Sequence, residues 1–143
     1  MNRNETLPAT DFDKLLDRER TLAGLPARID LSQITGLWRL DHSYRYDPER
    51  RSWVTPISHL HDDVRTRFDA NGTLEEYEAE FTTIRSSYRF DPQRWTLTWE
   101  NCEHYIVSLM PSYMAMVIYE PVTEKRDCEE TYKFVYERLS ILN

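Results

Sequence analysis

The sequence is poor in glycine and cysteine and has no long hydrophobic segment. Only three glycines occur in 143 residues, which excludes collagen-like and low-complexity character. Two cysteines, Cys102 and Cys128, are too few for a disulfide framework and lack the spacing of a metal site. No apolar run approaches the ~20 residues of a membrane helix, and the polar N-terminus lacks the apolar core of a signal peptide. We therefore expect a cytoplasmic protein with free thiols.

The distribution of charge narrows the class of partner. The net charge is −7, and the basic residues, most of them arginine, alternate with acids instead of forming a patch. Non-specific binding to nucleic acids or anionic membranes needs a basic surface, so neither is an expected partner. The length suits one domain with a sizeable core, and aromatic residues, at 13%, are abundant.

An amphipathic helix is predicted near the N-terminus. Thr10 or Asp11 can cap it, apolar residues recur with a period near 3.6 from Phe12 to Ala23, and Gly24 provides a natural end. We assign residues 1–35 to an N-terminal extension that contains this helix. The helix either covers one wall of the remaining domain or docks a protein partner or a second subunit, as in a homodimer.

From Gly36 onward the period changes to two, which predicts β-strands. Eight segments alternate in this way: about 36–46, 62–69, 73–81, 83–90, 95–99, 103–109, 113–120 and 132–139. Eight consecutive antiparallel strands favour an all-β, up-and-down barrel over residues 36–143, because closure leaves no exposed edges. A β-sandwich is the alternative, although it needs more long crossovers than the sequence offers.

Two details refine the predicted barrel. Met114–Tyr119 is apolar throughout, which indicates a strand buried on both sides, with its outer side under the N-terminal helix. Acidic residues of one predicted strand lie next to two arginines of the following strand, which is typical of cross-strand charge pairing on an outer wall. They are Glu75, Glu76, Glu78 and Glu80, beside Arg85 and Arg89. We therefore assign no catalytic pair of carboxylates to these residues.

Several short motifs then suggest a family. They are Gly36-Leu37-Trp38 on the first strand, Phe68 and Gly72 around a hairpin, Tyr88 and Phe90, Thr96–Trp99, and Tyr132–Leu139 on the last strand. With these residues the chain resembles the lipocalin-like (calycin) domains, especially the small bacterial ones, over about residues 36–140. The resemblance implies a structural role for Gly36, Trp38 and Arg138, with the indole inside the closed base and the guanidinium across its ring. Such a cation–π contact contributes ~0.5–2 kcal/mol.

Strand alternation places a largely aromatic set of side chains, Tyr105 among them, inside the barrel. The candidate ligand-binding residues are His42, Tyr44, Trp53, Tyr77, Ser86, Tyr88, Trp99, Tyr132 and Tyr136. Trp53 belongs to a long connection, 47–60, which we expect to act as a lid over the mouth. Hydroxyls and an imidazole among apolar walls suit a small amphipathic ligand. The alternative is a packed aromatic core whose hydroxyls bond one another.

The leading functional hypothesis is therefore non-catalytic binding of a small hydrophobic or amphipathic molecule inside the barrel, with no cofactor. A second hypothesis is a protein-interaction or scaffold module with a filled barrel. A third is a barrel isomerase or lyase with His42 and a tyrosine as acid and base. No catalytic residue is assigned, because the sequence lacks a nucleophile elbow. His59 and His61 bind a metal only if loops converge on them, so we assign no metal site.

Overall fold

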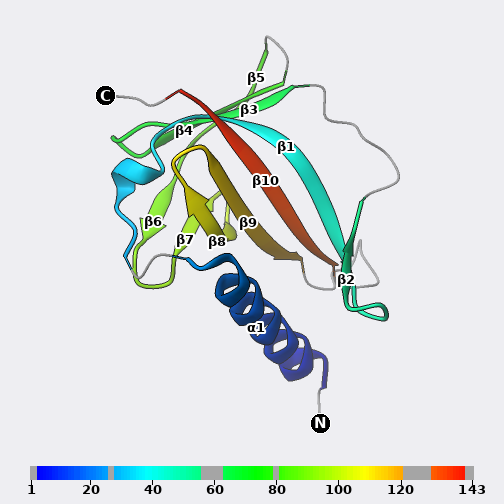
Figure 1. Ribbon diagram of the computed structural model, residues 1–143. Helices are drawn as coiled ribbons and strands as arrows, with labels where there is room; N and C mark the ends of the chain where they lie inside the picture. Colours follow the sequence, from blue (N-terminus) through cyan, green and yellow to red (C-terminus); the bar gives the residue numbers. More distant parts are fainter. Residues whose placement is uncertain (1–2, 26–27, 56–62, 79–80, 121–129, 141–143) are drawn as a thin grey trace.

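The computed structural model describes residues 3–25, 28–55, 63–78, 81–120 and 130–140, which form an antiparallel barrel with one long helix outside it (Figure 1). The helices are α1 (Arg3–Ala23) and the short 3-10 helix η1 (Leu31–Gln33). The strands are β1 (Gly36–Asp47), β2 (Ser52–Val54), β3 (Val64–Phe68), β4 (Thr73–Glu78), β5 (Phe81–Ser87), β6 (Arg89–Asp91), β7 (Thr96–Trp99), β8 (Cys102–Met110), β9 (Tyr113–Glu120) and β10 (Glu130–Ser140).

The strands form one sheet that curls until its first and last members meet. Their order is β5-β4-β3-β1-β10-β9-β8-β7-β6, with β2 beside β1. Strands β5 and β6 stand at opposite ends of that order, yet only Tyr88 separates them in the chain. The last strand, β10, pairs with β1 from Leu37 to Arg45. The predicted up-and-down barrel is therefore confirmed. The described residues form ten strands instead of the predicted eight, because β2 is additional and the predicted strand 83–90 is split at Tyr88.

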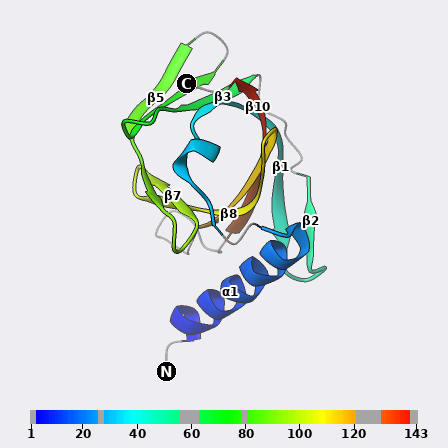
Figure 2. The same cartoon turned by 60° about the vertical axis from the view of Figure 1, so that its left-hand side comes forward.

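One end of the barrel, which we call the base, is covered by η1. Figure 2 looks into the barrel and shows this helical turn lying across its opening. Ile29 and Ile34, on either side of η1, are buried in the same apolar cluster as Trp38 and Phe68. Gly36 opens β1 with φ of 134°, which only glycine adopts without strain. The chain can therefore turn sharply from η1 into β1.

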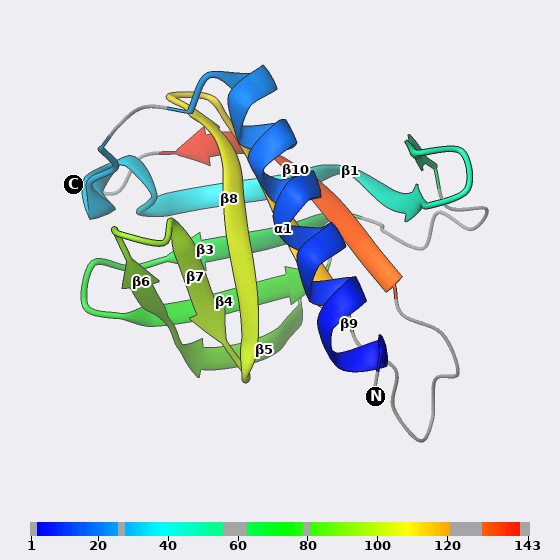
Figure 3. The same cartoon turned by 90° about the horizontal axis from the view of Figure 1, so that it is seen from below.

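Helix α1 packs against the outside of the barrel, beside β8, β9 and β10 (Figures 1 and 3). Phe12 and Leu16 form an outer apolar cluster with Val117 and Val135. The apolar face of the helix is therefore used within the chain, which confirms the wall-covering interpretation. It also explains why β9 is apolar on both sides. The helix begins at Arg3, earlier than the predicted cap. No helix among the described residues combines the length and apolar character that a bilayer crossing needs.

Two polar contacts hold α1 in place. The Lys133 Nζ on β10 lies 2.9 Å from the Glu19 carboxylate, in an ion pair that is largely shielded from water. The Arg20 Nε donates to the Ile106 carbonyl oxygen at 2.8 Å, and its guanidinium lies 5.2 Å from the centre of the Trp95 ring. Burial lowers the pKa of Arg20. The helix is thus anchored by directional bonds as well as by apolar packing.

A β-bulge in β1 decides which of its side chains face the interior. Leu40 pairs with Tyr136, and His42 pairs with the preceding residue of β10, Val135. Asp41 is therefore an extra residue in β1 without an opposite partner. Because side chains alternate along a strand, one extra residue exchanges the two faces. Ser43, which pairs with the inward Phe134, takes the place inside the barrel that His42 would otherwise occupy.

Candidate functional site

The base of the barrel has partners for its polar side chains. The Trp38 Nε1 donates to the Ile34 carbonyl oxygen at 2.7 Å. The guanidinium carbon of Arg138 lies 4.2 Å from the centre of the Trp38 ring, so the predicted contact is confirmed. Arg138 also donates to the backbone carbonyl oxygens of Gln33, Thr35 and Pro111. These bonds tie η1 and the β8–β9 turn to the last strand, which makes the base a structural seal.

Above the base, the β3–β4 hairpin places Thr66 and Glu76 together on the inner wall. Phe68 pairs with Leu74, and both are fully buried. Two residues further along each strand, Thr66 pairs with Glu76, so both share the inner side. The Thr66 hydroxyl oxygen is buried and has no hydrogen-bond partner among the described residues. A buried polar atom without a partner is uncommon in a native fold and invites an explanation.

Acidic groups surround this part of the interior. Burial raises the pKa of the Glu76 carboxyl, and the charges of Glu100 and Glu78 raise it further. Tyr136 is buried on the facing strand β10, and its hydroxyl pKa is raised by burial and then by the charge of Glu76. The electrostatic effect of Glu76 on Tyr136 indicates that the two groups act across the same interior space.

A neutral imidazole lies on the opposite side of the interior. His104 on β8 is buried and stacks on Trp99, with 3.5 Å between ring centres and an angle of 8° between the rings. Its Nδ1 lies 3.1 Å from the Cys102 carbonyl oxygen. Burial lowers the pKa of His104 to about 4. The ring is therefore uncharged at neutral pH and offers hydrogen bonding without a positive charge.

Several inward side chains at this level are only partly buried. Strand pairing directs Leu40, Ser43, Ile84, Ser86, Tyr132 and Phe134 toward the interior, and each retains some exposure to solvent. At the base, by contrast, Trp38, Phe68 and Leu74 are completely buried. The inner wall therefore changes from a closed apolar core to a mixed surface with accessible polar and apolar groups. We call this part the upper interior.

Five of the predicted ligand-binding residues do face the interior. Ser86, Trp99, Tyr132 and Tyr136 lie on the inner side of their strands. Tyr88 lies lower, in the buried core, and its hydroxyl donates to the Asp69 carbonyl oxygen at 2.6 Å. That bond occupies the Tyr88 hydroxyl in the seal of the base. A ligand contact for the other four stays a prediction.

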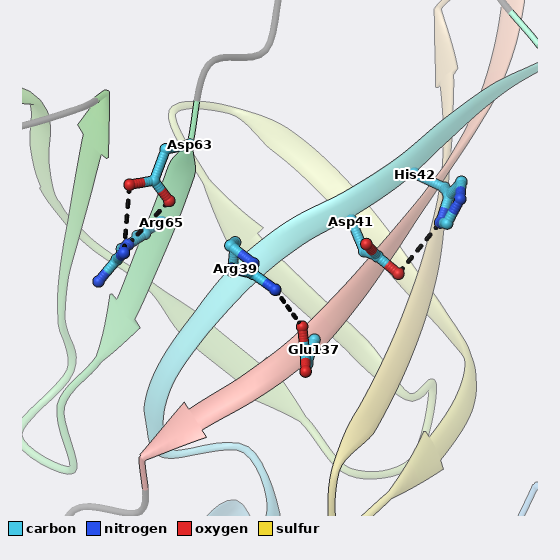
Figure 4. Close-up of polar contacts among 6 residues, drawn as sticks. All are labelled: Arg39, Asp41, His42, Asp63, Arg65 and Glu137. Carbon is cyan, nitrogen blue, oxygen red and sulfur yellow. Dashed lines mark hydrogen bonds and ion pairs between the residues drawn. The ribbon is translucent and has the colours of Figure 1, made fainter.

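The inward orientation predicted for His42 and Tyr44 is wrong, because the bulge at Asp41 exchanges the faces of β1. The His42 side chain is 57% exposed, and its Nδ1 lies 3.1 Å from the Asp41 carboxylate (Figure 4). Tyr44 packs against the outer cluster under α1. Figure 4 also shows Arg39 directed toward Glu137 on the outside of the same strand pair. His42 is therefore not placed to act as the general base inside the barrel that the isomerase or lyase hypothesis requires.

Tyr77 and Trp53 are also outside the barrel. Tyr77 pairs with Arg65 on the face opposite Thr66 and Glu76, near the Glu75–Arg85 ion pair of 3.0 Å. The predicted charge pairing is thus confirmed for Glu75 and wrong for Glu76. Trp53 pairs with Tyr46 and packs on the outer cluster. It does not cover the mouth as a lid.

Three residues of the interior are missing from the ligand-binding set that the sequence predicted. They are Thr66, Glu76 and His104. A signal for Glu76 was present in the hairpin around Gly72. With Phe68 opposite Leu74 in that turn, alternation places Glu76 inside. For His104 the signal is weaker, because the neighbouring Tyr105 looked like the inward aromatic. Tyr105 instead contacts Phe12 of the helix, with 5.1 Å between ring centres.

The remaining predictions concern metals and thiols. Cys102 is a free thiol whose pKa is raised by burial. Cys128, His59, His61 and Asp62 lie outside the described residues. A disulfide or a metal site that involves them therefore stays a prediction. Within the described part of the chain, no group of three or more His, Cys, Asp or Glu side chains is arranged to hold a metal ion.

Comparisons with known proteins support the fold. No protein-family model matches the sequence, and no curated protein matches it. The LTBP1–LTC4 complex is 10% identical, with a TM-score of 0.51 over 83% of this chain and 76% of that chain. A tyrosine-to-alanine mutant of LTBP1 with leukotriene C4 is 11% identical, with a TM-score of 0.50 over the same shares. LTBP1 is a lipocalin-fold protein.

This chain has a lipocalin-like fold. At such low identity the similarity concerns the arrangement of strands alone, and it assigns no ligand. The closure of β10 onto β1 and the seal over Trp38 are the features of this chain that match the expectation from its motifs. What the lipocalin-like barrel holds must be argued from its own inner wall.

Proposed function

We propose that the upper interior binds a small hydrophobic or amphipathic molecule without catalysing a reaction. The observation that supports this most directly is the pairing of Thr66 and Glu76 on the inner wall. The Thr66 hydroxyl has no partner among the described residues, and the Glu76 carboxyl is destabilised as an anion. A bound polar group would satisfy both. Removing apolar ligand surface from water would provide affinity at ~25 cal/mol per Å².

The charges of the upper interior favour particular ligand head groups. The negative charges of Glu100 and Glu78 raise the pKa of the Glu76 carboxyl, and the imidazole of His104 is neutral at pH 7. An anionic head group would add to this repulsion, whereas a hydroxyl, an amide or an ammonium group would hydrogen-bond to the carboxyl or neutralise it. We therefore propose neutral or cationic amphiphiles as the preferred ligand class. The structural similarity to LTBP1, whose structures contain leukotriene C4, supports a binding role.

The scaffold hypothesis has less support in the described residues. Its predicted surface was either the N-terminal helix or the apolar wall of the strands at about 103–109 and 113–120. Phe12, Leu15 and Leu16 of the helix are buried, and the helix packs against this wall at Val107 and Val117. A homodimer or protein partner that uses either surface would have to displace the helix.

The proposal can be tested with three amphiphiles that share one chain and differ in head-group charge. Dodecan-1-ol, dodecyltrimethylammonium and dodecanoate are used below their micelle concentrations to displace the fluorescent probe N-phenyl-1-naphthylamine. We expect the first two to bind more tightly than dodecanoate. In Glu76→Gln the preference for the cation over dodecanoate should shrink by about tenfold, which corresponds to ~1.4 kcal/mol.

A matched pair of variants locates the binding site. Ser43→Phe places a ring inside the barrel, whereas His42→Phe places the same ring outside, one residue earlier on β1. We expect Ser43→Phe to weaken dodecan-1-ol binding at least tenfold and His42→Phe to leave it unchanged. Equal effects of the two variants, or no binding of any amphiphile, would contradict the proposal.

A further inference from the structure

A separate groove lies outside the barrel, between α1 and the hairpin that joins β1 to β2. Its volume is about 480 Å³, within the range of small-molecule sites. Lys14 and Arg18 border it from the helix, and Tyr46 and Arg51 border it from the hairpin. It belongs to the outer surface, so it is distinct from the upper interior.

The cations of this groove have no acidic partners. Elsewhere on the outer surface, Arg39 pairs with Glu137 at 2.5 Å and Arg65 pairs with Asp63 at 2.9 Å. Lys14, Arg18 and Arg51 make no ion pair with any described residue, although all three border one groove.

The charge of the residues that line the groove is opposite in sign to the net charge of the chain. Among the described residues that line it, Asp11 is the only acidic one, which leaves an excess of two positive charges. The chain as a whole has a net charge of −7. Positive charges held close together favour an anion between them, so charge complementarity points to an anionic occupant.

The backbone at Arg51 gives a second reason to look for a ligand here. Arg51 has φ of 53°, in the left-handed region that glycine occupies at no steric cost. The turn before it is well made, because the Asp47 Oδ1 accepts from the backbone N–H of Glu49 at 3.0 Å and of Arg50 at 3.3 Å. An arginine where glycine fits better places a cation at the groove. Strained positions of this kind cluster at ligand sites.

Aromatic rings form the apolar part of the groove. Phe12 and Tyr119 both line it, with 5.3 Å between their ring centres. Tyr46 lines the hairpin side and packs edge-on against Trp53 at 5.2 Å. A planar apolar body can pack on the partly exposed rings of Tyr46 and Tyr119 while an attached anionic group reaches the cations.

We propose that this outer groove binds a small aromatic anion, such as an aromatic carboxylate, sulfonate or phosphate. Its preference for negative charge is opposite to that of the upper interior, because its cations are unpaired whereas the inner wall is acidic. The two sites would therefore take different ligands at the same time.

Isothermal titration calorimetry with naphthalene-1-sulfonate tests the proposal, with naphthalene-1-methanol as the neutral analogue. We expect the sulfonate to bind, the alcohol to bind at least tenfold more weakly, and the sulfonate affinity to fall as salt is added. Arg18→Gln should weaken sulfonate binding by about three- to tenfold. The control is Arg89→Gln, which removes an exposed arginine of β6 that makes no ion pair with the described residues. It should have no effect.

Arg51→Gly separates a binding role from a structural one. Glycine relieves the positive φ, so the variant should be at least as resistant to urea as the wild type, yet it should bind the sulfonate three- to tenfold more weakly. Ser43→Phe, which obstructs the interior, should leave sulfonate binding unchanged. The proposal is overturned if the alcohol binds as well as the sulfonate, if Arg18→Gln and Arg51→Gly bind normally, or if Ser43→Phe abolishes the binding.

Discussion

The base and the upper interior of the barrel are built from the same strands, yet they treat polar groups in opposite ways. At the base, the indole N–H of Trp38 and the guanidinium of Arg138 all reach backbone carbonyls. In the upper interior, the hydroxyl of Thr66 lacks a partner and the carboxyl of Glu76 is disfavoured as an anion. The base therefore contributes stability, whereas the upper interior retains hydrogen-bonding capacity that the fold itself does not use.

This difference follows from how far each part of the barrel interior lies from η1. Close to η1, carbonyl groups at helix and turn ends are available as acceptors, and side chains with several donors can satisfy them. Further up, the inner wall consists of paired strands whose backbone groups already bond to one another. The His104 ring still reaches the Cys102 carbonyl oxygen there. The Thr66 hydroxyl has no partner among the described residues, so it is left for water or a ligand.

The largest expected effect is the loss of the seal at the base. Arg138→Ala removes the bonds to the carbonyls of Gln33, Thr35 and Pro111 and the contact with Trp38. We expect the free energy of unfolding to fall by about 3 kcal/mol, measured by urea denaturation. The control is Arg39→Ala, which removes an exposed ion pair with Glu137 and should cost less than ~1 kcal/mol. Similar losses in the two variants would contradict a special role of the base.

A smaller effect concerns the pH dependence of the upper interior. The pKa of His104 is lowered to about 4, so the unfolded chain takes up a proton at higher pH than the folded chain does. Stability is therefore fully present above pH ~6.5 and is lost as the pH falls toward 4. Glu76 acts with the opposite sign, because its raised pKa favours the folded state on acidification.

Comparison with His104→Phe isolates the contribution of the imidazole, since phenylalanine can keep the stacking on Trp99. Between pH 7 and pH 4.5 the wild type should lose about 2 kcal/mol more stability than the variant. The measurement is urea denaturation at the two pH values, with Glu76 present in both proteins. Parallel pH curves would show that His104 is not buried as a neutral ring.

The smallest expected effect tests the unused hydroxyl. Thr66→Val replaces it with a methyl group of similar size and should raise the free energy of unfolding by up to ~1 kcal/mol, because no hydrogen bond is lost. Thr66→Ser keeps the hydroxyl, removes the methyl group and should destabilise the protein. A thermal melt of the three proteins provides the comparison. A destabilised valine variant would mean that water or a neighbouring side chain already bonds to Thr66.

The features that the sequence predicted correctly depend on patterns that persist over a whole strand. The alternation from Tyr132 to Leu139 placed Arg138 on the same side as Phe134 and Tyr136, and the apolar run of β9 indicated a covering helix. Both signals extend over several residues, so a local irregularity does not erase them. The barrel, its closure and the contact between Trp38 and Arg138 could therefore be predicted.

The composition of the site was harder to predict, because it depends on single-residue shifts. Asp41 has no sequence signature of a bulge, and without it the pattern of β1 places His42 inside. Aromatic residues were also assumed to face inward, which misplaced Tyr77 and Tyr105. In this protein many aromatic rings lie on the outer wall, where a helix covers them. Neither the extra residue nor the cover is visible within one strand.

The extra residue in β1 thus has a consequence for the whole architecture. The bulge at Asp41 exchanges the two faces of β1, so Tyr44 and Tyr46 project outward. Tyr44 joins the cluster beneath α1, and Tyr46 borders the cationic groove. Deleting Asp41 would turn both rings toward the lumen, obstruct the upper interior and remove Tyr44 from the cluster on which α1 packs. One aspartate therefore decides on which side of the barrel two aromatic rings of β1 lie.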